Sequence, residues 1–206
     1  MLRGIIFDLD GTLVQSHLDF DKMRQEMNLS QATPILEALE TMDDLQAARC
    51  REILQRHERQ AAKQATAMPG AADFLDRLDS LKIFRGVVTR NSRQSAWELL
   101  SLFSHRFDPV ISRDDGPIKP DPWAILQICE AWNLLPQQVA IIGDFRFDIE
   151  AGRNAGAKTV FFTQGREAGN LPGIGQVDFR LTSLLEVGEL VLWLSQDDLG
   201  PAEQSC

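Results

Sequence analysis

The chain has 206 residues, of which 44% are hydrophobic and 25% charged. This length suits one large domain, or one domain with a smaller insert, and it can bury a sizeable core. The formal net charge of −9, from 21 basic and 30 acidic residues, argues against binding to nucleic acid polymers or anionic membranes, since both surfaces would repel the protein. A small anionic ligand in a local basic pocket is compatible with this charge.

Three scattered cysteines, Cys50, Cys129 and Cys206, show neither a zinc spacing nor a disulfide framework, which indicates a reducing compartment. The apolar run at the N-terminus reaches Asp8 after three residues and is too short for a signal peptide. No stretch approaches the roughly 20 apolar residues of a membrane span. We therefore expect a soluble, cytoplasmic protein without a membrane partner, and the sequence leaves its oligomeric state open.

The chain begins with a predicted buried strand and then changes character. Gly4–Leu9 is a short apolar run, typical of a strand buried on both faces. From about residue 19 to 66, Gln, Glu, Ala, Arg and Leu dominate, and apolar residues such as Phe20, Met23 and Met27 recur at helical spacing. Met68-Pro69-Gly70 ends this stretch. We expect residues 15–68 to form a small, all-helical insert.

From Pro69 onward, strands and helices alternate. This alternation predicts an α/β fold with a Rossmann-like parallel sheet covered by helices on both faces, built from residues 1–14 and 69–206. Gly165–Gly175, with four glycines and a proline, is expected to be a loop. The predicted strands are Phe84–Thr89, Pro109–Ser112, Val139–Gly143, Thr159–Phe162 and an edge strand Phe179–Leu181. The predicted helices are Ala72–Leu81, Ser95–Phe103, Pro122–Trp132, Asp148–Asn154 and Leu184–Leu194.

Polar residues follow several of these strands, at the edge where an open parallel sheet binds ligands. Four carboxylates and one lysine come together at this predicted edge. Grouped carboxylates in a partly dry cleft need a neutralising partner, and a hard divalent cation such as Mg²⁺ serves best. The candidates, in chain order, are Asp8, Asp10, Thr12, Thr89, Arg90, Asn91, Lys119, Asp144 and Asp148.

These residues form four motifs that together resemble the haloacid dehalogenase-like (HAD) phosphohydrolases. The motifs are Asp8–Val14, Val88–Asn91, Ile118–Pro122 and Gly143–Gly156, in the order that the family has them. The most similar branch is the phosphoglycolate phosphatase-like one, in which a helical cap is inserted after the first motif, where residues 15–68 lie. The resemblance implies a HAD-like core and a phosphatase that hydrolyses a small-molecule phosphomonoester through an aspartyl-phosphate, with Mg²⁺ as cofactor.

The resemblance also implies catalytic roles. Asp8 would be the nucleophile, and Asp10 would protonate the leaving oxygen and then deprotonate the attacking water. The role of Asp10 requires a raised pKa, which its like-charged neighbour Asp8 can supply. Lys119 would neutralise Asp8 and the transferring phosphoryl group. Thr89 would bind a phosphoryl oxygen through its hydroxyl, together with the backbone amides of Arg90 and Asn91.

For the metal, the resemblance implies a carboxylate oxygen of Asp8, the backbone carbonyl of Asp10 and the carboxylate of Asp144 as ligands. Asp148 would bind through water or orient another ligand. Asp148 also has a purely structural reading, as an acid in the first turn of a helix, and Asp144 has one as a helix N-cap.

One departure from the family's pattern lies in the fourth motif. Phe145, followed by Arg146 and Phe147, stands where this branch often has a small hydroxyl residue, so we expect a reshaped pocket. Arg90 and Arg146 would add positive charge over the phosphate without being catalytic.

The substrate itself is not readable. Arg24, Gln25 and Arg51 of the insert are candidate specificity residues.

Three alternatives remain open at this point. The same core could serve a phosphotransferase such as a sugar-phosphate mutase, in which a second hydroxyl replaces water. A phosphorylation-switch module of the receiver type would lack the helical insert and a late acid pair such as Asp144 and Asp148. A non-catalytic binding module on this core would be expected to have lost one of Asp8, Asp10, Lys119 or Asp144, and the chain has all four.

Overall fold

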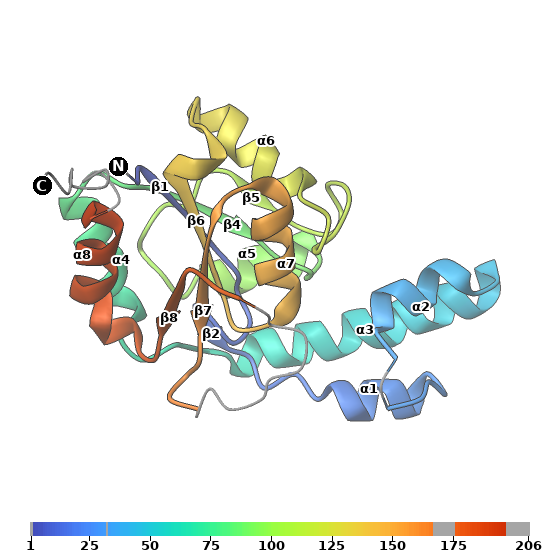
Figure 1. Cartoon of the computed structure of the whole chain (residues 1–206). Helices are drawn as coiled ribbons and strands as arrows, with labels where there is room; N and C mark the ends of the chain where they lie inside the picture. Colours follow the sequence, from blue (N-terminus) through green and yellow to red (C-terminus); the bar gives the residue numbers. More distant parts are fainter. Residues whose placement is uncertain (1, 32, 167–175, 197–206) are drawn as a thin grey trace, which may run out of the picture.

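The computed structural model describes residues 2–31, 33–166 and 176–196, and a six-stranded sheet lies at its centre (Figure 1). The strands are β1 Gly4–Phe7, β4 Phe84–Val88, β5 Val110–Ile111, β6 Val139–Gly143, β7 Lys158–Phe162 and β8 Phe179–Leu181. Their order is β5-β4-β1-β6-β7-β8, and all neighbouring strands are parallel. The predicted parallel sheet and its edge strand near the C-terminus are confirmed.

Helices cover both faces of this sheet. They are α4 Ala71–Ser80, α5 Arg93–Leu100, α6 Trp123–Trp132, α7 Arg146–Ala155 and α8 Val187–Gln196, with short 3-10 turns at Pro136–Gln138 and Leu184–Glu186. Side chains alternate along each strand. Ile5 and Phe7 of β1 therefore join the core beneath α4, α5 and α8, while Ile6 joins the core beneath α6 and α7. A strand that is apolar on both sides needs both layers of helices.

The first strand lies in the middle of the sheet, and the chain changes direction around it. From β1 the chain continues to β4 and β5 on one side, and β6, β7 and β8 lie on the other. Such a reversal creates a ligand site beyond the carboxyl ends of the central strands. Asp8, Thr89 and Asp144 directly follow β1, β4 and β6, so the topology brings these three residues to one place.

Between β1 and α4 the chain leaves the sheet and forms a helical insert. Its helices are α1 Phe20–Glu26, α2 Ile35–Thr41 and α3 Asp44–Gln64, which extend away from the sheet (Figure 1). The side chain of Asp43 caps α3 by accepting a hydrogen bond from the Gln46 amide at 2.8 Å. The insert has its own apolar cluster of Met23, Met27, Ile35, Leu39, Cys50, Ile53 and Leu54, which confirms that the helical spacing of apolar residues indicates a core.

Two very short strands join the insert to the rest of the molecule. β2 (Val14–Gln15) and β3 (Thr66–Ala67) pair antiparallel, and we call this pair the neck. The sequence did not indicate these strands, because two residues cannot display the alternation that identifies a strand.

Two helices begin two residues earlier than predicted, and a capping side chain explains each case. The hydroxyl of Ser92 accepts a hydrogen bond from the Ser95 amide at 3.3 Å, so α5 begins at Arg93. The carboxylate of Asp148 accepts one from the Phe145 amide at 3.1 Å, so α7 begins at Arg146. Most of the predicted loop Gly165–Gly175 lies outside the described residues, as does the polar tail after residue 196.

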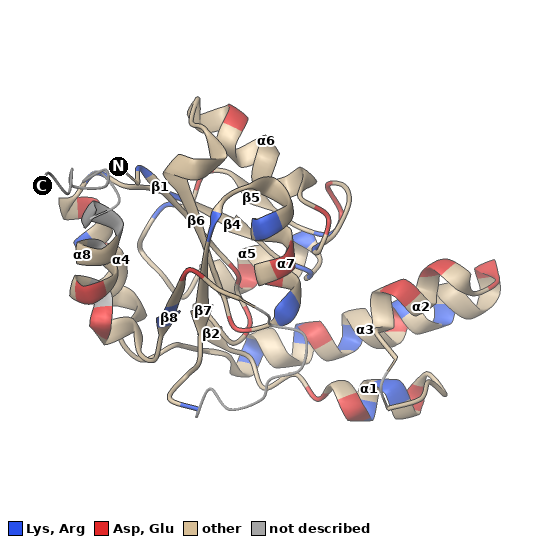
Figure 2. Cartoon of the chain, viewed as in Figure 1, with Lys and Arg blue, Asp and Glu red and all other residues tan. Residues whose placement is uncertain are grey.

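The distribution of charged residues and the hydropathy of the helices agree with the composition of the chain. Acidic and basic residues are interspersed along the helices of the insert (Figure 2). Within the described part of the chain, no helix combines the length and the hydropathy that a bilayer crossing requires. Cys50 and Cys129 are buried free thiols, and Cys206 lies outside the described residues.

Candidate active site

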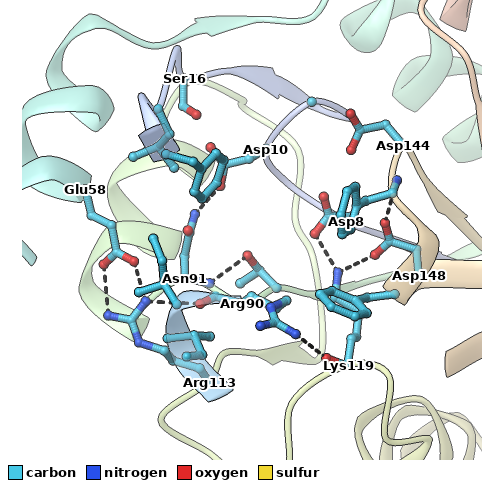
Figure 3. A pocket seen from close by; sticks show the side chains of 18 of the residues that line it. Asp8, Asp10, Ser16, Glu58, Arg90, Asn91, Arg113, Lys119, Asp144 and Asp148 are labelled. Carbon is cyan, nitrogen blue, oxygen red and sulfur yellow. Dashed lines mark hydrogen bonds and ion pairs between the residues drawn. The ribbon is translucent and has the colours of Figure 1, made fainter. Parts of the chain in front are cut away.

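Three carboxylates and one lysine meet at the carboxyl ends of β1 and β6 (Figure 3). Nζ of Lys119 donates hydrogen bonds to Oδ1 of Asp8 and to Oδ1 of Asp148, each at 2.6 Å. One carboxylate oxygen each of Asp8, Asp144 and Asp148 lies within 4.8 Å of the other two. We call Asp8, Lys119, Asp144 and Asp148 the acidic floor. The structure thus brings together four predicted site residues from three distant parts of the chain.

Two glycines allow this close approach. Gly11 has a φ of +79°, a conformation that favours glycine, and a Cβ there would collide with the Asp144 carboxylate. A Cβ at Gly143 would collide with the side chain of Asp148. The first and fourth motifs therefore need glycine at these positions so that carboxylates can pack directly against the backbone.

Burial and crowding change the acidity of the floor. Burial is the largest cause of a pKa of Asp8 well above its usual range; Lys119 opposes it, and Asp148 and Asp144 add to it. Burial, followed by the charge of Asp148, raises the pKa of Asp144 to about 7. Burial disfavours charge on Lys119, but the carboxylates of Asp148 and Asp8 raise its pKa nonetheless. When ionised, the three carboxylates therefore carry more negative charge than the lysine neutralises.

This donor set fits a divalent cation. Three ionised carboxylates and one ammonium have a net charge of −2 (−3 + 1), which one doubly charged ion balances. Both oxygens of Asp148 are engaged, Oδ1 by Lys119 and Oδ2 by the Phe145 amide. Oδ2 of Asp8 and Oδ1 of Asp144 form no hydrogen bond with a described residue, so these two residues would be the direct ligands. Hard oxygen donors of this kind suit Mg²⁺.

A second group of potential ligands, Asp76, Asp79 and His105, does not fit a cation as well. Both aspartates are exposed, and Nη2 of Arg85 already forms an ion pair with Asp79 at 2.6 Å. Solvent already screens the charges of these exposed carboxylates, whereas the floor gathers three largely buried carboxylates around one ammonium, so the acidic floor is the better metal site.

Asp10 lies beside the acidic floor and turns its carboxylate toward Asn91 and Ser16 (Figure 3). Nδ2 of Asn91 donates a hydrogen bond to Oδ2 of Asp10, whereas Oδ1 is buried without a partner among the described residues. Burial raises the pKa of Asp10; the nearby Ser16 hydroxyl and the Asn91 amide lower it, and the charge of Glu58 raises it. The expected raised pKa is confirmed, but burial is its main cause and not the neighbouring Asp8.

The second motif presents a hydroxyl and a guanidinium to the site. The Asn91 amide donates a hydrogen bond to Oγ1 of Thr89 at 3.1 Å, which leaves the hydroxyl hydrogen of Thr89 available to a ligand. Nη1 of Arg90 donates to the backbone oxygen of Lys119 at 2.5 Å. The guanidinium carbon of Arg90 lies 4.4 Å from the centre of the Phe147 ring, within cation–π range.

A cavity of about 550 Å³ joins these residues to the insert, and its volume suits a small metabolite. Besides the acidic floor, Asp10 and Thr89, the core contributes Arg90, Arg113 and Arg146, which we call the arginine rim. The segment Phe145–Phe147 lines the cavity, as the departure in the fourth motif indicated. From the neck and the insert come, among others, Gln15, Phe20, Arg24, Ile35, Leu54 and Glu58.

Two glutamates of the insert form ion pairs with the arginine rim, and the sequence analysis missed both. Glu58 of α3 accepts hydrogen bonds from Nη2 of Arg113 and from the hydroxyl of Ser92, each at 3.0 Å (Figure 3). Glu37 of α2 accepts from Nη2 of Arg90 at 2.8 and 2.9 Å. These contacts connect the insert directly to the core across the cavity.

For Glu58, the sequence did contain a signal. Ala47, Cys50, Leu54 and Ala61 share a buried helical stripe with it, and a glutamate in such a stripe needs a buried partner. Glu37 is partly exposed, and no local pattern distinguishes it from other surface glutamates.

Of the three predicted specificity residues, Arg24 lines the cavity, whereas Gln25 and Arg51 are exposed and do not. The guanidinium of Arg24 is engaged by the Thr33 carbonyl and the Asp21 carboxylate, each at 3.0 Å. The insert thus contributes fewer uncommitted polar groups to the cavity than its sequence suggested.

Comparisons with known proteins agree on one family. A family model described as haloacid dehalogenase-like hydrolase matches residues 17–162. A haloacid dehalogenase-like hydrolase domain-containing protein of Arabidopsis thaliana is 32% identical over 206 residues, which cover 92% of this chain and 84% of that protein. An N-acetylmuramic acid 6-phosphate phosphatase of Pseudomonas putida is 28% identical over 187 residues, covering 80% and 84%. The crystal structure of a predicted phosphoglycolate phosphatase from Haemophilus somnus has a TM-score of 0.73 at 21% identity, covering 92% and 98%.

Proposed function

Since the chain belongs to the haloacid dehalogenase-like hydrolases, in their phosphoglycolate phosphatase-like branch, and is a phosphatase, we propose that it hydrolyses a small phosphorylated metabolite with Mg²⁺ and through a phosphorylated Asp8. One observation carries this proposal. Lys119 holds the Asp8 carboxylate beside Asp144 and at the wall of a cavity of metabolite size.

In the first step, a carboxylate oxygen of Asp8 attacks phosphorus, and the bond between phosphorus and the ester oxygen breaks. Asp10 gives its proton to the leaving oxygen. Its buried, unpartnered Oδ1 and its raised pKa support this role, because the group must be protonated when substrate binds. In the second step, water attacks phosphorus, the bond to Asp8 breaks, and Asp10 takes the proton of the water.

Lys119 and Thr89 act on charge that develops during transfer. The Lys119 ammonium stabilises the Asp8 carboxylate and the phosphoryl oxygens next to it. The Thr89 hydroxyl donates a hydrogen bond to a phosphoryl oxygen, and the backbone amide of Arg90 is placed to join it. The Asn91 amide, expected as a further donor, instead donates to the Thr89 hydroxyl oxygen. A Mg²⁺ ion held by Asp8 and Asp144, with the Asp10 carbonyl as a further ligand and Asp148 in support, would neutralise the remaining charge of the floor and the substrate.

We further propose that residues 15–68 act as a cap domain on a core of residues 1–14 and 69–206. The separate apolar cluster of the insert and the two-residue strands of the neck support this division. A cap that closes over the cavity admits a small ester and excludes water. The buried free thiols Cys50 and Cys129 fit the reducing, cytoplasmic setting that we propose.

The test is a phosphate-release screen over small phosphomonoesters, with and without Mg²⁺, on the wild type, Asp8→Asn and the matched surface variant Asp73→Asn. We expect Mg²⁺-dependent release that falls on the order of 10³-fold or more in Asp8→Asn and is unchanged in Asp73→Asn. Circular dichroism should show that both variants are folded.

Full activity of Asp8→Asn, or equal release without Mg²⁺, would contradict the proposal. To separate a hydrolase from a phosphotransferase, an acceptor sugar phosphate is added. Free phosphate as the product supports hydrolysis, whereas an isomeric sugar phosphate in its place supports the mutase.

A further inference from the structure

Two guanidinium groups of the arginine rim gather around one aromatic ring. The guanidinium carbons of Arg90 and Arg146 lie 4.4 Å and 4.8 Å from the centre of the Phe147 ring. All three residues line the same cavity. The ring orients both cations through cation–π contacts without neutralising either of them. Glu37 compensates the charge of Arg90, whereas the charge of Arg146 has no ion-pair partner among the described residues.

Among the described residues, nothing compensates the charge of Arg146 or accepts hydrogen bonds from its guanidinium. No described residue forms a hydrogen bond or an ion pair with its guanidinium, and its Nε is buried without a partner. Leaving a buried N–H unsatisfied costs free energy, so a native structure normally provides an acceptor for it. Within the described wall of the cavity, that acceptor is missing, which indicates that a ligand supplies it.

A carboxylate of the chain itself shows what kind of ligand suits this place. Glu37 of the insert accepts two contacts from Nη2 of Arg90, at 2.8 and 2.9 Å. Burial acts against ionisation of Glu37, but Arg90 and then Arg146 hold its pKa below the usual value. The carboxylate of Glu37 therefore already interacts with the positive charge of these two arginines.

We infer that Arg90 and Arg146 form a second anion-binding subsite, which takes a carboxylate or a second phosphoryl group of the substrate and which Glu37 occupies in part when no ligand is bound. This inference rests on the proposed function, since it concerns the far end of the same substrate. Planar guanidinium groups bind such anions through paired hydrogen bonds. The substrate is accordingly a phosphomonoester with a second acidic group, and not a neutral sugar or alcohol ester.

The subsite lies within reach of the acidic floor. Arg90 directly follows Thr89 and donates to the backbone oxygen of Lys119, and Arg146 lies between Asp144 and Asp148 in the chain. One small molecule can therefore place its phosphoryl group on the floor and its second anionic group on the two arginines.

The test measures binding without catalysis. Calorimetry at fixed free Mg²⁺ compares phosphonocarboxylates with one to three methylenes between the acidic groups against propylphosphonate, which has no carboxylate. We expect the best phosphonocarboxylate to bind the wild type at least about 10-fold more tightly than propylphosphonate. Arg146→Gln should remove this preference without weakening propylphosphonate, and the exposed matched variant Arg106→Gln should retain it.

Glu37→Gln separates a competing carboxylate from a simple structural ion pair. If Glu37 occupies the subsite, its replacement tightens phosphonocarboxylate binding by about threefold or more and leaves propylphosphonate unchanged. Equal weakening of both ligands in Glu37→Gln would overturn the competition, and equal binding of both ligands to the wild type would overturn the subsite.

The results of these binding measurements do not depend on whether the protein hydrolyses a phosphate ester. A phosphatase without a preference for the phosphonocarboxylate disproves the subsite alone. A preference that depends on Arg146 in a protein that releases no phosphate disproves the proposed function and leaves the subsite standing.

Discussion

The acidic floor and the arginine rim line the same cavity, but they handle buried charge in opposite ways. On the floor, three carboxylates share one ammonium, that of Lys119, and all four groups come from the core. On the rim, the cations come from the core and the carboxylates that neutralise two of them come from the insert. The floor is left short of positive charge and the rim is left with a surplus, at Arg146. A phosphorylated acid with a metal ion would complete both.

The comparison also separates two kinds of contact. The floor is fixed by the sheet, since its residues follow β1 and β6 directly or lie close to these strands. The rim depends on how the insert sits on the core, because Glu37 and Glu58 reach it from α2 and α3. We therefore expect substitutions in the floor to affect chemistry and stability together, and substitutions in the ion pairs of the rim to affect stability and the position of the insert.

The largest effect should follow the loss of the lysine from the floor. Lys119→Met leaves Asp8 and Asp148 buried beside each other without a cation, which should lower the free energy of unfolding by about 3–5 kcal/mol in Mg²⁺-free buffer at pH 8. Phosphatase activity should fall by about 10²–10³-fold. Urea unfolding and phosphate release measure the two effects.

Added Mg²⁺ should restore part of the stability of Lys119→Met, because a divalent ion replaces the missing positive charge. Lys63→Met, at an exposed position of α3, is the matched control and should be neutral. Equal loss in both variants, or no recovery with Mg²⁺, would show that the floor does not depend on its lysine for charge balance.

The next largest effect concerns the buried ion pair of the rim. Arg113→Met removes the partner of Glu58, a side chain that is 3% exposed, and should cost about 3 kcal/mol of stability in urea unfolding. Glu58→Gln on the same background should recover part of this loss, because no unpaired charge then remains. The comparison variant Arg93→Met breaks an ion pair in which the arginine is 58% exposed, and should cost less than about 1 kcal/mol. Similar losses of stability in Arg113→Met and Arg93→Met would contradict the expected difference between a buried and an exposed ion pair.

The smallest expected effect is the pH dependence of Mg²⁺ binding to the floor. Because burial raises the pKa of Asp144 to about 7, the folded protein holds this proton more tightly than the unfolded chain does, and the associated stability is lost as pH rises through 7. Mg²⁺ requires the ionised carboxylates of Asp144 and Asp8, and the pKa of Asp8 is raised as well, so the affinity should rise by about tenfold or more per pH unit up to 7 and more slowly above it.

Calorimetry between pH 5.5 and 8.5 measures this slope, and the Mg²⁺-induced increase in melting temperature should grow with pH in parallel. Asp144→Asn should abolish both. An affinity that does not change with pH would mean that Asp144 is ionised throughout this range.

The sequence predicted the floor better than the rim, and the reason is physical. Asp8 and Asp144 of the floor directly follow strands of a parallel sheet, as Thr89 does, so the strand pattern alone places these three residues at one edge. Lys119 and Asp148 were placed there by their motifs. The alternation of apolar strands and helices likewise predicted the sheet and its two layers. The caps that set the start of α5 and α7 are single hydrogen bonds, which shift a boundary without changing the apolar pattern.

Arg90 and Arg146 were predicted to lie near the phosphate, but the ion pairs between the rim and the insert were not predictable, because their partners meet only after the insert has docked. Arg90 lies 53 residues from Glu37, and Arg113 lies 55 residues from Glu58. No local periodicity encodes such pairs. The buried glutamate in the stripe of α3 indicates that a partner exists, but not which of the chain's arginines it is.

The neck has a mechanical consequence. Its strand β2 begins inside the turn that carries Asp10: the Gly11 amide donates to the Val14 carbonyl oxygen at 2.8 Å, and the Val14 amide donates to Leu9 at 3.0 Å. The Met68 amide donates to Leu13 at 2.8 Å on the return path. A swing of the insert about the neck would therefore shift the loop that bears Asp10, the proposed proton donor. We expect the movement that releases the product also to displace the Asp10 carboxylate, so that the enzyme is inactive while it is open.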